Sequence, residues 1–413
     1  MRRTAALVSC LALGLAPAAC QDQITQPAPD AISGTEISDA GIATSPMASV
    51  LPELASPGIP GPVPDGFDPG WAEGAINGQV YQCTESTPVL SFLNNIINQS
   101  IAVELPLLLD LNSLAAFDLP FYEALFLPYT GPQEYGYDGD FTNVIQRTDQ
   151  ASRRFWDISS DHIEVVPLKG TMVLDVNRVA TVYEEVFALD PITAAFFAGI
   201  VRDLTLASQT LDGGNHPLFS ANAFAAGFSG RLAMGDAILE GYAEFGMGDV
   251  AAQGIFAHEY AHHVQFEKGY FSEDPPSFDP GNIDQAERTR YTELMADAMA
   301  AYFLTHKRGA AANWWRVEQF LEVFFNVGDC FFSADGHHGT PEQRLRTARW
   351  AYELATDAQV QGDILTADEF HDLFVAEYLS FIAPDLGAPP PDDNVDPGNS
   401  RGSGNGPKVY AGP

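Results

Sequence analysis

The chain has 413 residues and carries 55 acidic against 20 basic side chains, a formal net charge of −35. Such an excess of negative charge argues against nucleic acid, or an anionic membrane face, as a partner. Hydrophobic residues make up 46% of the chain, which is enough for a sizeable core, although neither end has the composition of a globular domain.

Residues 1–20 have the order of a secretory signal. Two basic residues, Arg2 and Arg3, precede an apolar run from Ala5 to Ala16 that is too short to remain as a membrane-spanning helix. Cys20 follows Pro-Ala-Ala, which resembles a bacterial lipoprotein processing site, where the cysteine becomes the lipid-bearing N-terminus. We therefore expect an exported cell-envelope protein whose contact with a membrane is this lipid, or a secreted protein if ordinary signal cleavage occurs instead.

The next segments pass from a tether into a folded region. Residues 21–75 are rich in Pro, Gly, Ser, Ala and Asp, with almost no large apolar side chains, which is typical of a disordered linker. From Val80 to about Leu127 the chain is strongly apolar, in runs shorter than a membrane span, which predicts buried helices. Alternation between Asp161 and Val176 predicts a β-hairpin that turns at Lys169-Gly170.

The segment from Ala257 to Gln265 contains the pattern HExxH, at His258, Glu259 and His262. Four residues of helix advance about 400°, so the two histidines share one face and can bind one cation. Glu259 can then reach a metal-bound water without being a ligand. Zinc lowers the pKa of such a water towards about 7, so that the carboxylate can take its proton and hydroxide can attack a carbonyl.

A chance match on a surface helix is the alternative interpretation of this segment. The apolar flanks argue against it, because buried histidines and a buried carboxylate would be costly without a metal. The helix is predicted to begin at Asp249 and to end at Gly269. His263 is predicted to be a packing or hydrogen-bonding residue, since it lies about 100° round the helix from His262. The apolar flanks are Ile255, Phe256, Ala257, Ala261, Val264 and Phe266.

A catalytic zinc needs a third protein ligand and an open position. Position 268 is Lys, so the extended form of the motif, with a third histidine, is absent. A second helix is predicted from about Gln285 to Lys307; Glu293 on it is the best candidate ligand, with Glu267 in reserve. Asp297, one turn after Glu293, could accept the outer N–H of a liganding histidine. A solvated carboxylate pair is the alternative; against it, small residues indicate a close helix contact at Ala296, Ala298, Ala300 and Ala301.

Capping residues mark the starts of two later helices. Residues 340–343 (Thr-Pro-Glu-Gln) have the sequence of a capping box with proline at the first helical position, which predicts a helix running through Trp350. Residues 366–369 (Thr-Ala-Asp-Glu) predict another through Tyr378. Residues 383–413 have the composition of a disordered tail.

His338 and Arg344 flank the start of the first of these helices. His338 could face the metal site and stabilise an oxyanion, and Arg344 could anchor the loop by pairing with an acid. A pair of surface histidines, His337 and His338, is the alternative that the residues alone leave open.

Three blocks of sequence together resemble the bacterial neutral zinc metallopeptidase family, a gluzincin-like group whose third zinc ligand is Glu. The blocks are HEYAHHVQ at 258–265, ELMAD at 293–297 and HGTPEQR at 338–344, and the resemblance covers roughly residues 230–350. It implies His258, His262 and Glu293 as ligands of one Zn²⁺, Glu259 as general base, Asp297 as the residue that orients a ligand, and His338 as a transition-state helper. Three positions depart from the family pattern without removing a ligand: Ala261, Met295 and Ala298 stand where the family usually has Gly, Gln and Cys.

Two cysteines remain once the leader is removed and Cys20 is assigned. In an oxidising compartment Cys83 and Cys330 most simply form one disulfide. An alternative assigns Cys83 as a zinc-binding latency switch upstream of the catalytic region.

The sequence as a whole predicts an α+β, mainly helical, zincin-like metallopeptidase domain over residues 76–382. Its substrate would be a peptide or protein, cleaved internally. By analogy with zinc peptidases, Arg231 to Phe245 is placed as an edge strand that an extended substrate joins, with a core strand or a short helix as the alternative. Two other functions remain open: a catalytically inactive relative that keeps zinc, and a cell-envelope interaction protein in which HExxH is coincidental.

Overall fold

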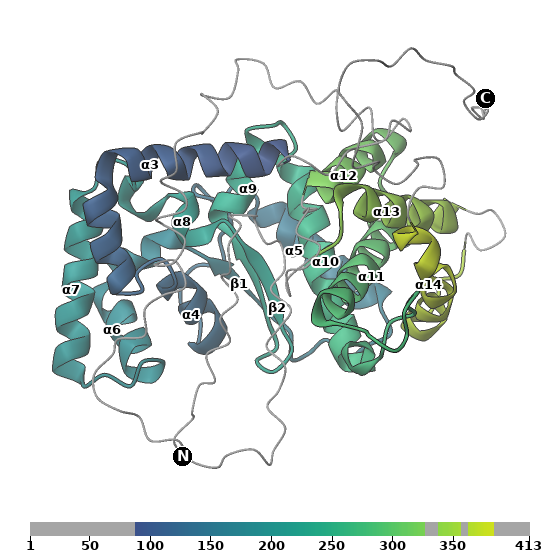
Figure 1. Ribbon diagram of the computed structural model, residues 1–413, viewed down its shortest axis with the longest axis horizontal. Coiled ribbons are helices and arrows are strands. Elements are labelled where there is room, and N and C mark those ends of the chain that lie inside the picture. The colour runs from purple at the N-terminus through teal and green to yellow at the C-terminus, as the bar shows by residue number, and fades with distance from the viewer. Residues whose placement is uncertain (1–86, 327–337, 357–361, 384–413) are drawn as a thin grey trace, which may run out of the picture. The chain divides into compact units, whose positions relative to one another are not determined.

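The computed structural model describes residues 87–326, 338–356 and 362–383, and over these residues the protein is mainly helical with one three-stranded sheet (Figure 1). The predicted α+β, mainly helical class is therefore confirmed. Cys20, Cys83, Cys330, the predicted leader and tether, and the tail beyond Ala383 lie outside the described residues. Among the described helices, none combines the length and the hydropathy that crossing a membrane requires.

Four helices of the N-terminal half share one hydrophobic core, and the first two of them are the buried helices that the apolar run predicts. They are α3 (Pro88–Ser113), α4 (Leu119–Phe126), α6 (Val176–Glu185) and α7 (Pro191–Ala207). Asp175 and Asp190 cap α6 and α7 by accepting backbone N–H groups of the first turn. Helix α3 is kinked at Glu104, just before Pro106, because proline lacks an N–H and its ring crowds the preceding turn.

The sheet lies between this cluster and the later helices. Its strands are β1 (Glu164–Leu168), β2 (Ala223–Ala226) and β3 (Arg231–Gly235), in the order β1-β3-β2. β1 runs parallel to β3, and β2 runs antiparallel to it. Helix α4 contacts β1 and β3, while α10 (Gly248–Lys268) contacts β2 and β3. Both faces of the sheet are therefore covered, and every residue of β2 and β3 is buried.

The predicted β-hairpin between Asp161 and Val176 is wrong in its second half. The first half forms β1, but the chain then enters a 3₁₀ turn, η1 (Gly170–Leu174). Gly170 lies directly against the backbone of Gly214, in the turn η2 (Asp212–Gly214), and a Cβ atom there would approach the Gly214 carbonyl oxygen to 2.1 Å. Because η1 packs on η2, β1 takes its partner from β3 instead, far along the chain.

The placement of Arg231 to Phe245 as an edge strand is also wrong. Residues 231–235 form β3, which is the central strand of the described sheet, and the next residues form helix α9 (Asp236–Ala243). The backbone groups of β3 are paired on both sides, so an extended substrate cannot add to this strand. The alternative interpretation is a core strand or a short helix, and the segment contains both, one after the other.

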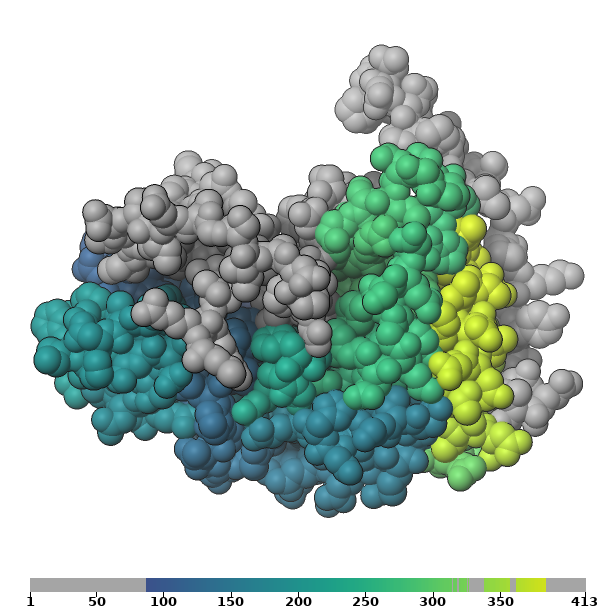
Figure 2. All heavy atoms as spheres, turned by 90° about the horizontal axis from the view of Figure 1, so that it is seen from below, coloured from purple at the N-terminus to yellow at the C-terminus, as the bar shows by residue number. Residues whose placement is uncertain are grey.

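Helix α10 is the centre of the C-terminal half. It contacts α5, α9, α11 and α12, and α11 in turn packs against α13. On the face drawn in Figure 2, the yellow surface of α14 adjoins the blue surface of the α5 region. Trp156, which follows α5, packs edge-on against Phe370 of α14. The remaining helices are α5 (Thr142–Phe155), α8 (Pro217–Ser220), η3 (Tyr270–Ser272), α11 (Gln285–Thr305), α12 (Trp314–Asn326), α13 (Pro341–Thr356) and α14 (Ala367–Ile382).

The ends of these helices lie close to where the sequence predicts them. Helix α10 begins at Gly248, one residue before the predicted Asp249, and ends at Gly269, whose φ of 80° is the left-handed conformation of a helix terminus. The capping box at the start of α13 is reciprocal, with Thr340 N–H donating to Gln343 and Gln343 N–H donating to Thr340. Helix α11 is buried at every residue from Tyr291 to Thr305, so any carboxylate on that stretch lies in the interior.

Candidate metal centre

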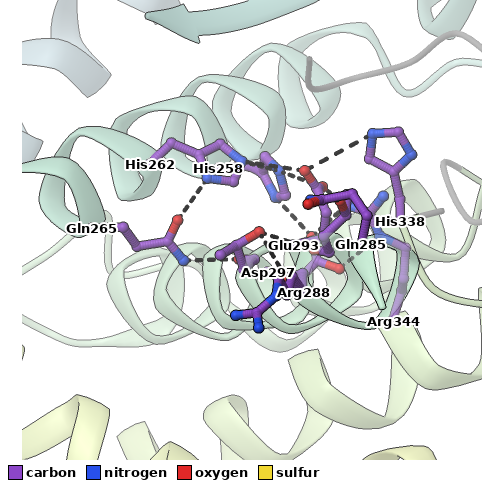
Figure 3. Close-up of polar contacts among 11 residues, drawn as sticks. His258, His262, Gln265, Gln285, Arg288, Glu293, Asp297, His338 and Arg344 are labelled. Carbon is purple, nitrogen blue, oxygen red and sulfur yellow. Dashed lines mark hydrogen bonds and ion pairs between the residues drawn. The ribbon is translucent and has the colours of Figure 1, made fainter. Parts of the chain in front are cut away.

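The crossing of α10 and α11 brings together the three side chains predicted to bind metal. Ligand atoms of His258, His262 and Glu293 all lie within 4.8 Å of one another, and all three residues are buried (Figure 3). The two Nε2 atoms are 3.0 Å apart, and the Glu293 carboxylate lies 3.3 Å from His258 Nε2 and 3.7 Å from His262 Nε2. This group can hold a metal ion. A solvated carboxylate on the surface, the alternative for Glu293, is therefore wrong.

The Nδ1 atoms of both histidines lie next to hydrogen-bond acceptors, and this determines which ring nitrogen carries the hydrogen. Asp297 Oδ1 lies 2.8 Å from His258 Nδ1, and a carboxylate only accepts, so Nδ1–H donates to it. Gln265 Nε2 donates to the Thr292 carbonyl at 2.8 Å, which turns Gln265 Oε1 towards His262 Nδ1 at 2.7 Å. In both rings Nε2 is then the nitrogen with a lone pair. Two lone pairs and a carboxylate facing one another fit a bound cation.

Arg344 anchors Asp297 from the first turns of α13. Its Nε and Nη2 atoms donate to the two carboxylate oxygens at 2.6 and 2.7 Å, and Nη2 is also 3.8 Å from Glu293. Burial opposes ionisation of Asp297, but the Arg344 charge and the His258 hydrogen bond outweigh it and hold the Asp297 pKa below its usual range. The expected pairing of Arg344 with an acid is thus present. Asp297 remains a charged acceptor for His258.

In His258, by contrast, burial outweighs the nearby charges. It lowers the His258 pKa to about 4, against the raising effect of the Asp297 hydrogen bond and charge. The imidazole is therefore neutral near pH 7, which is the form that binds metal.

His338 faces the same cluster from the segment before α13. Its Nε2 lies 3.9 Å from Glu293 Oε1, and the residue is 9% exposed, whereas Glu293 is fully buried. Gly339 has a φ of 99°, a conformation that glycine adopts easily and that turns the chain between His338 and the capping box. His338 therefore faces the cluster, as the sequence analysis expected, and the surface alternative does not hold for His338.

Two nearby polar side chains do not join the cluster. His263 donates from Nε2 to the Arg231 carbonyl at 3.0 Å, and burial lowers its pKa to about 4, so it is the hydrogen-bonding residue that the sequence predicts. Glu267, the reserve ligand, pairs with His162 at 3.0 Å, and both side chains are exposed by more than a third. Glu293 is therefore the ligand candidate that the fold selects.

Gln265 is the site residue that the sequence reasoning missed. A signal for it exists, because it lies three residues after His262 and so on the same face of the helix. The sequence does not reveal that the amide nitrogen of Gln265 donates to the Thr292 carbonyl on α11.

Aromatic rings border the cluster. The Phe324 ring is 6.5 Å from that of His258, and the Phe271 ring is 5.9 Å from that of His262. Such apolar neighbours exclude water and strengthen charge interactions inside the site. Within residues 87–326, 338–356 and 362–383, His258, His262 and Glu293 form the group whose spacing suits a metal ion. Comparison with protein-family models, with characterised proteins and with solved structures finds no significant match to this chain.

Proposed function

We propose that the protein is a zinc-dependent endopeptidase of the zincin-like, gluzincin type, with His258, His262 and Glu293 as the zinc ligands. The observation that carries the proposal is the convergence of two Nε2 lone pairs and one carboxylate within 4.8 Å. Two imidazoles and a carboxylate are one of the protein ligand sets of catalytic zinc, the one found in zinc peptidases, and HExxH supplies a further carboxylate as general base. The sequence blocks that resemble neutral zinc metallopeptidases support the same assignment.

Zinc bound here would lower the pKa of a water and polarise a peptide carbonyl. Glu259, next to His258 on α10 and fully buried, accepts the proton from the attacking water and passes it to the leaving amine. His338, on the Glu293 side of the cluster, donates a hydrogen bond to the substrate oxygen as negative charge develops on it. Asp297 and Arg344 keep His258 in the orientation and tautomer that the ion requires.

A catalytically inactive relative that keeps zinc for structure is the second candidate. The observation that favours it is burial, since His258 is 2% exposed and Glu259 and His262 are fully buried, and structural zinc sites are closed to solvent. A cell-envelope interaction protein with a coincidental HExxH is a weaker alternative, because coincidence does not explain why Glu293 meets the two histidines.

Metal analysis and one conservative substitution separate these functions. We expect about one zinc per chain. Glu259→Gln should keep that zinc and lose hydrolysis of casein or a peptide library by about 10²–10⁴-fold, because the amide cannot accept the proton. Glu267→Gln, on the same helix but exposed, is the matched control and should retain both zinc and activity.

Three results would point elsewhere. Absence of zinc from the purified protein contradicts the metal centre. Zinc without hydrolysis by the wild type supports the inactive relative. Equal activity of wild type and Glu259→Gln removes Glu259 from the mechanism.

A further inference from the structure

We propose that Gln265 is a positioning residue of the metal centre, holding His262 so that its Nε2 faces the ion. It is the neutral counterpart of Asp297, which does the same for His258 through a charged group. The inference rests on the proposed zinc site and adds to it a second ligand-orienting residue, which the HExxH pattern does not contain.

Both ends of the Gln265 amide are in use. Oε1 accepts from His262 Nδ1 at 2.7 Å, and Nε2 donates to the Thr292 carbonyl at 2.8 Å (Figure 3). Thr292 directly precedes Glu293, so one side chain on α10 touches both the second histidine and the backbone that carries the third ligand. The residue is fully buried, so water does not compete for either bond. Gln265 therefore links His262 on α10 to the backbone next to Glu293 on α11.

Charge explains why an amide suits this position better than a second Asp or Glu. Glu293 and Asp297 are already buried at the centre, Glu259 is buried on the same helix as the two histidines, and the guanidinium of Arg344 is held by Asp297. Another buried carboxylate would add negative charge at a high desolvation cost. It would also place an acceptor against the Thr292 carbonyl, which is itself an acceptor. The amide accepts at one end and donates at the other, as both neighbours require.

Two substitutions separate the two halves of the amide. Gln265→Met keeps the length of the side chain but can neither accept from His262 nor donate to Thr292. Gln265→Glu can still accept from His262 but cannot donate as a carboxylate. We expect Gln265→Met to weaken zinc binding by about 10–100-fold, the usual effect of losing a partner of a metal-bound histidine. Gln265→Glu should keep zinc affinity within about tenfold of wild type, while both variants lower the unfolding midpoint of the zinc-free protein.

The experiment is a zinc competition titration against a chromophoric chelator, using the full chain, with thermal unfolding in EDTA to report on stability. The visible spectrum of the Co²⁺-substituted protein should change in Gln265→Met and stay close to wild type in Gln265→Glu, because it reports on ligand geometry and not on stability. Gln253→Met, a half-buried position earlier on the same helix, is the control and should leave zinc affinity and the spectrum unchanged.

The outcomes distinguish this inference from the proposed function. Wild-type zinc affinity in Gln265→Met, or equal losses in Gln265→Met and Gln265→Glu, would overturn the positioning role and leave the peptidase proposal intact. The expected order of affinities in a protein that cleaves no peptide would support the role of Gln265 while the peptidase proposal fails. If the wild type binds no zinc, both are wrong.

Discussion

The side chains around the two histidines fix their hydrogens before any ion binds. His258 donates to Asp297 and His262 donates to Gln265, so each ring presents Nε2 towards Glu293. Asp297 is itself fixed by two bonds from Arg344. The site is therefore a connected set of polar groups in a buried region, where removing one member also changes the environment of its neighbours.

Replacing Asp297 tests this connection. Asp297→Asn removes the negative charge closest to Arg344 in a fully buried position, and we expect a loss of about 3–5 kcal/mol in the free energy of unfolding. It should also weaken zinc binding by about 10–100-fold, because an amide orients His258 less firmly than a carboxylate does. Urea unfolding in chelator and a zinc competition titration measure the two effects.

A double variant keeps the two effects apart. Adding Arg344→Met to Asp297→Asn should restore part of the stability, since the buried positive charge is then gone, but should not restore zinc affinity. Unchanged zinc affinity in Asp297→Asn would show that His258 is held by other contacts. As a surface reference, Glu267→Gln should change stability by about 0–1 kcal/mol.

Burial and end capping position the two helices that carry the proposed ligands. Helices α10 and α11 are each 21 residues long, and α11 lies between α10 and α13. A helix surrounded by other helices is apolar on most sides, so its sequence gives little information on which face meets which neighbour. The capping residues therefore carry most of the sequence information on where such a helix lies. An example is Asp284, which accepts a hydrogen bond from Glu287 N–H at the start of α11.

Two glycines, one directly after a helix and one inside a helix, should respond to alanine in opposite directions. Gly269 ends α10 with a φ of 80°, and although a Cβ atom there would meet no neighbour within 4 Å, Gly269→Ala should cost about 1 kcal/mol because of the left-handed backbone. Gly199 lies inside α7, also with open space around a Cβ, so Gly199→Ala should add about 0.5–1 kcal/mol. Chemical denaturation of the two variants is the measurement. A change of the same sign in both would contradict the argument.

Local signals predicted the helix ends and the residues of the candidate metal centre, and failed where the chain is organised by distant partners. The capping boxes at Thr340 and Thr366 and the terminus at Gly269 depend on a few adjacent residues, and the structure has all three. The hairpin failed because alternation does not identify the partner of a strand, and β1 pairs with β3 across the chain. The edge strand, which was placed by analogy, failed because β3 is paired on both sides. Gln265 was missed for the same reason, since its second partner, Thr292, is on another helix.

Across the whole molecule, several buried groups have pKa values that make stability depend on pH. Burial lowers the pKa of His216, His258 and His263 to about 4 in each case. Since an unfolded histidine titrates near 6.5, the unfolded chain binds protons that the folded one does not between about pH 6.5 and 4, and stability falls as the pH falls through this window. Burial raises the Asp236 pKa to about 6, despite the nearby Lys169. The folded protein then binds a proton that the unfolded chain does not, so Asp236 adds stability as the pH falls from about 6.

His216 offers a test of this effect away from the metal centre. Its Nδ1 accepts from Leu218 N–H, so Nε2 carries the hydrogen and donates to Ser100, whose hydroxyl donates to the Ile96 carbonyl. A proton on Nδ1 would break the first of these bonds inside the core. Each such histidine should therefore cost about 2 kcal/mol of stability at pH 5 relative to pH 7.

In His216→Asn, the side-chain oxygen can still accept from Leu218 N–H, but nothing at this position titrates. Between pH 7 and pH 5 the variant should lose about 2 kcal/mol less stability than the wild type, because one of the protons taken up on unfolding is absent. Urea unfolding at both pH values, with chelator present so that metal release does not contribute, gives the difference directly. His162→Asn, on the surface, should follow the wild type to within about 1 kcal/mol. Equal losses in wild type and His216→Asn would mean that the core admits the proton, and that burial of His216 does not set its pKa.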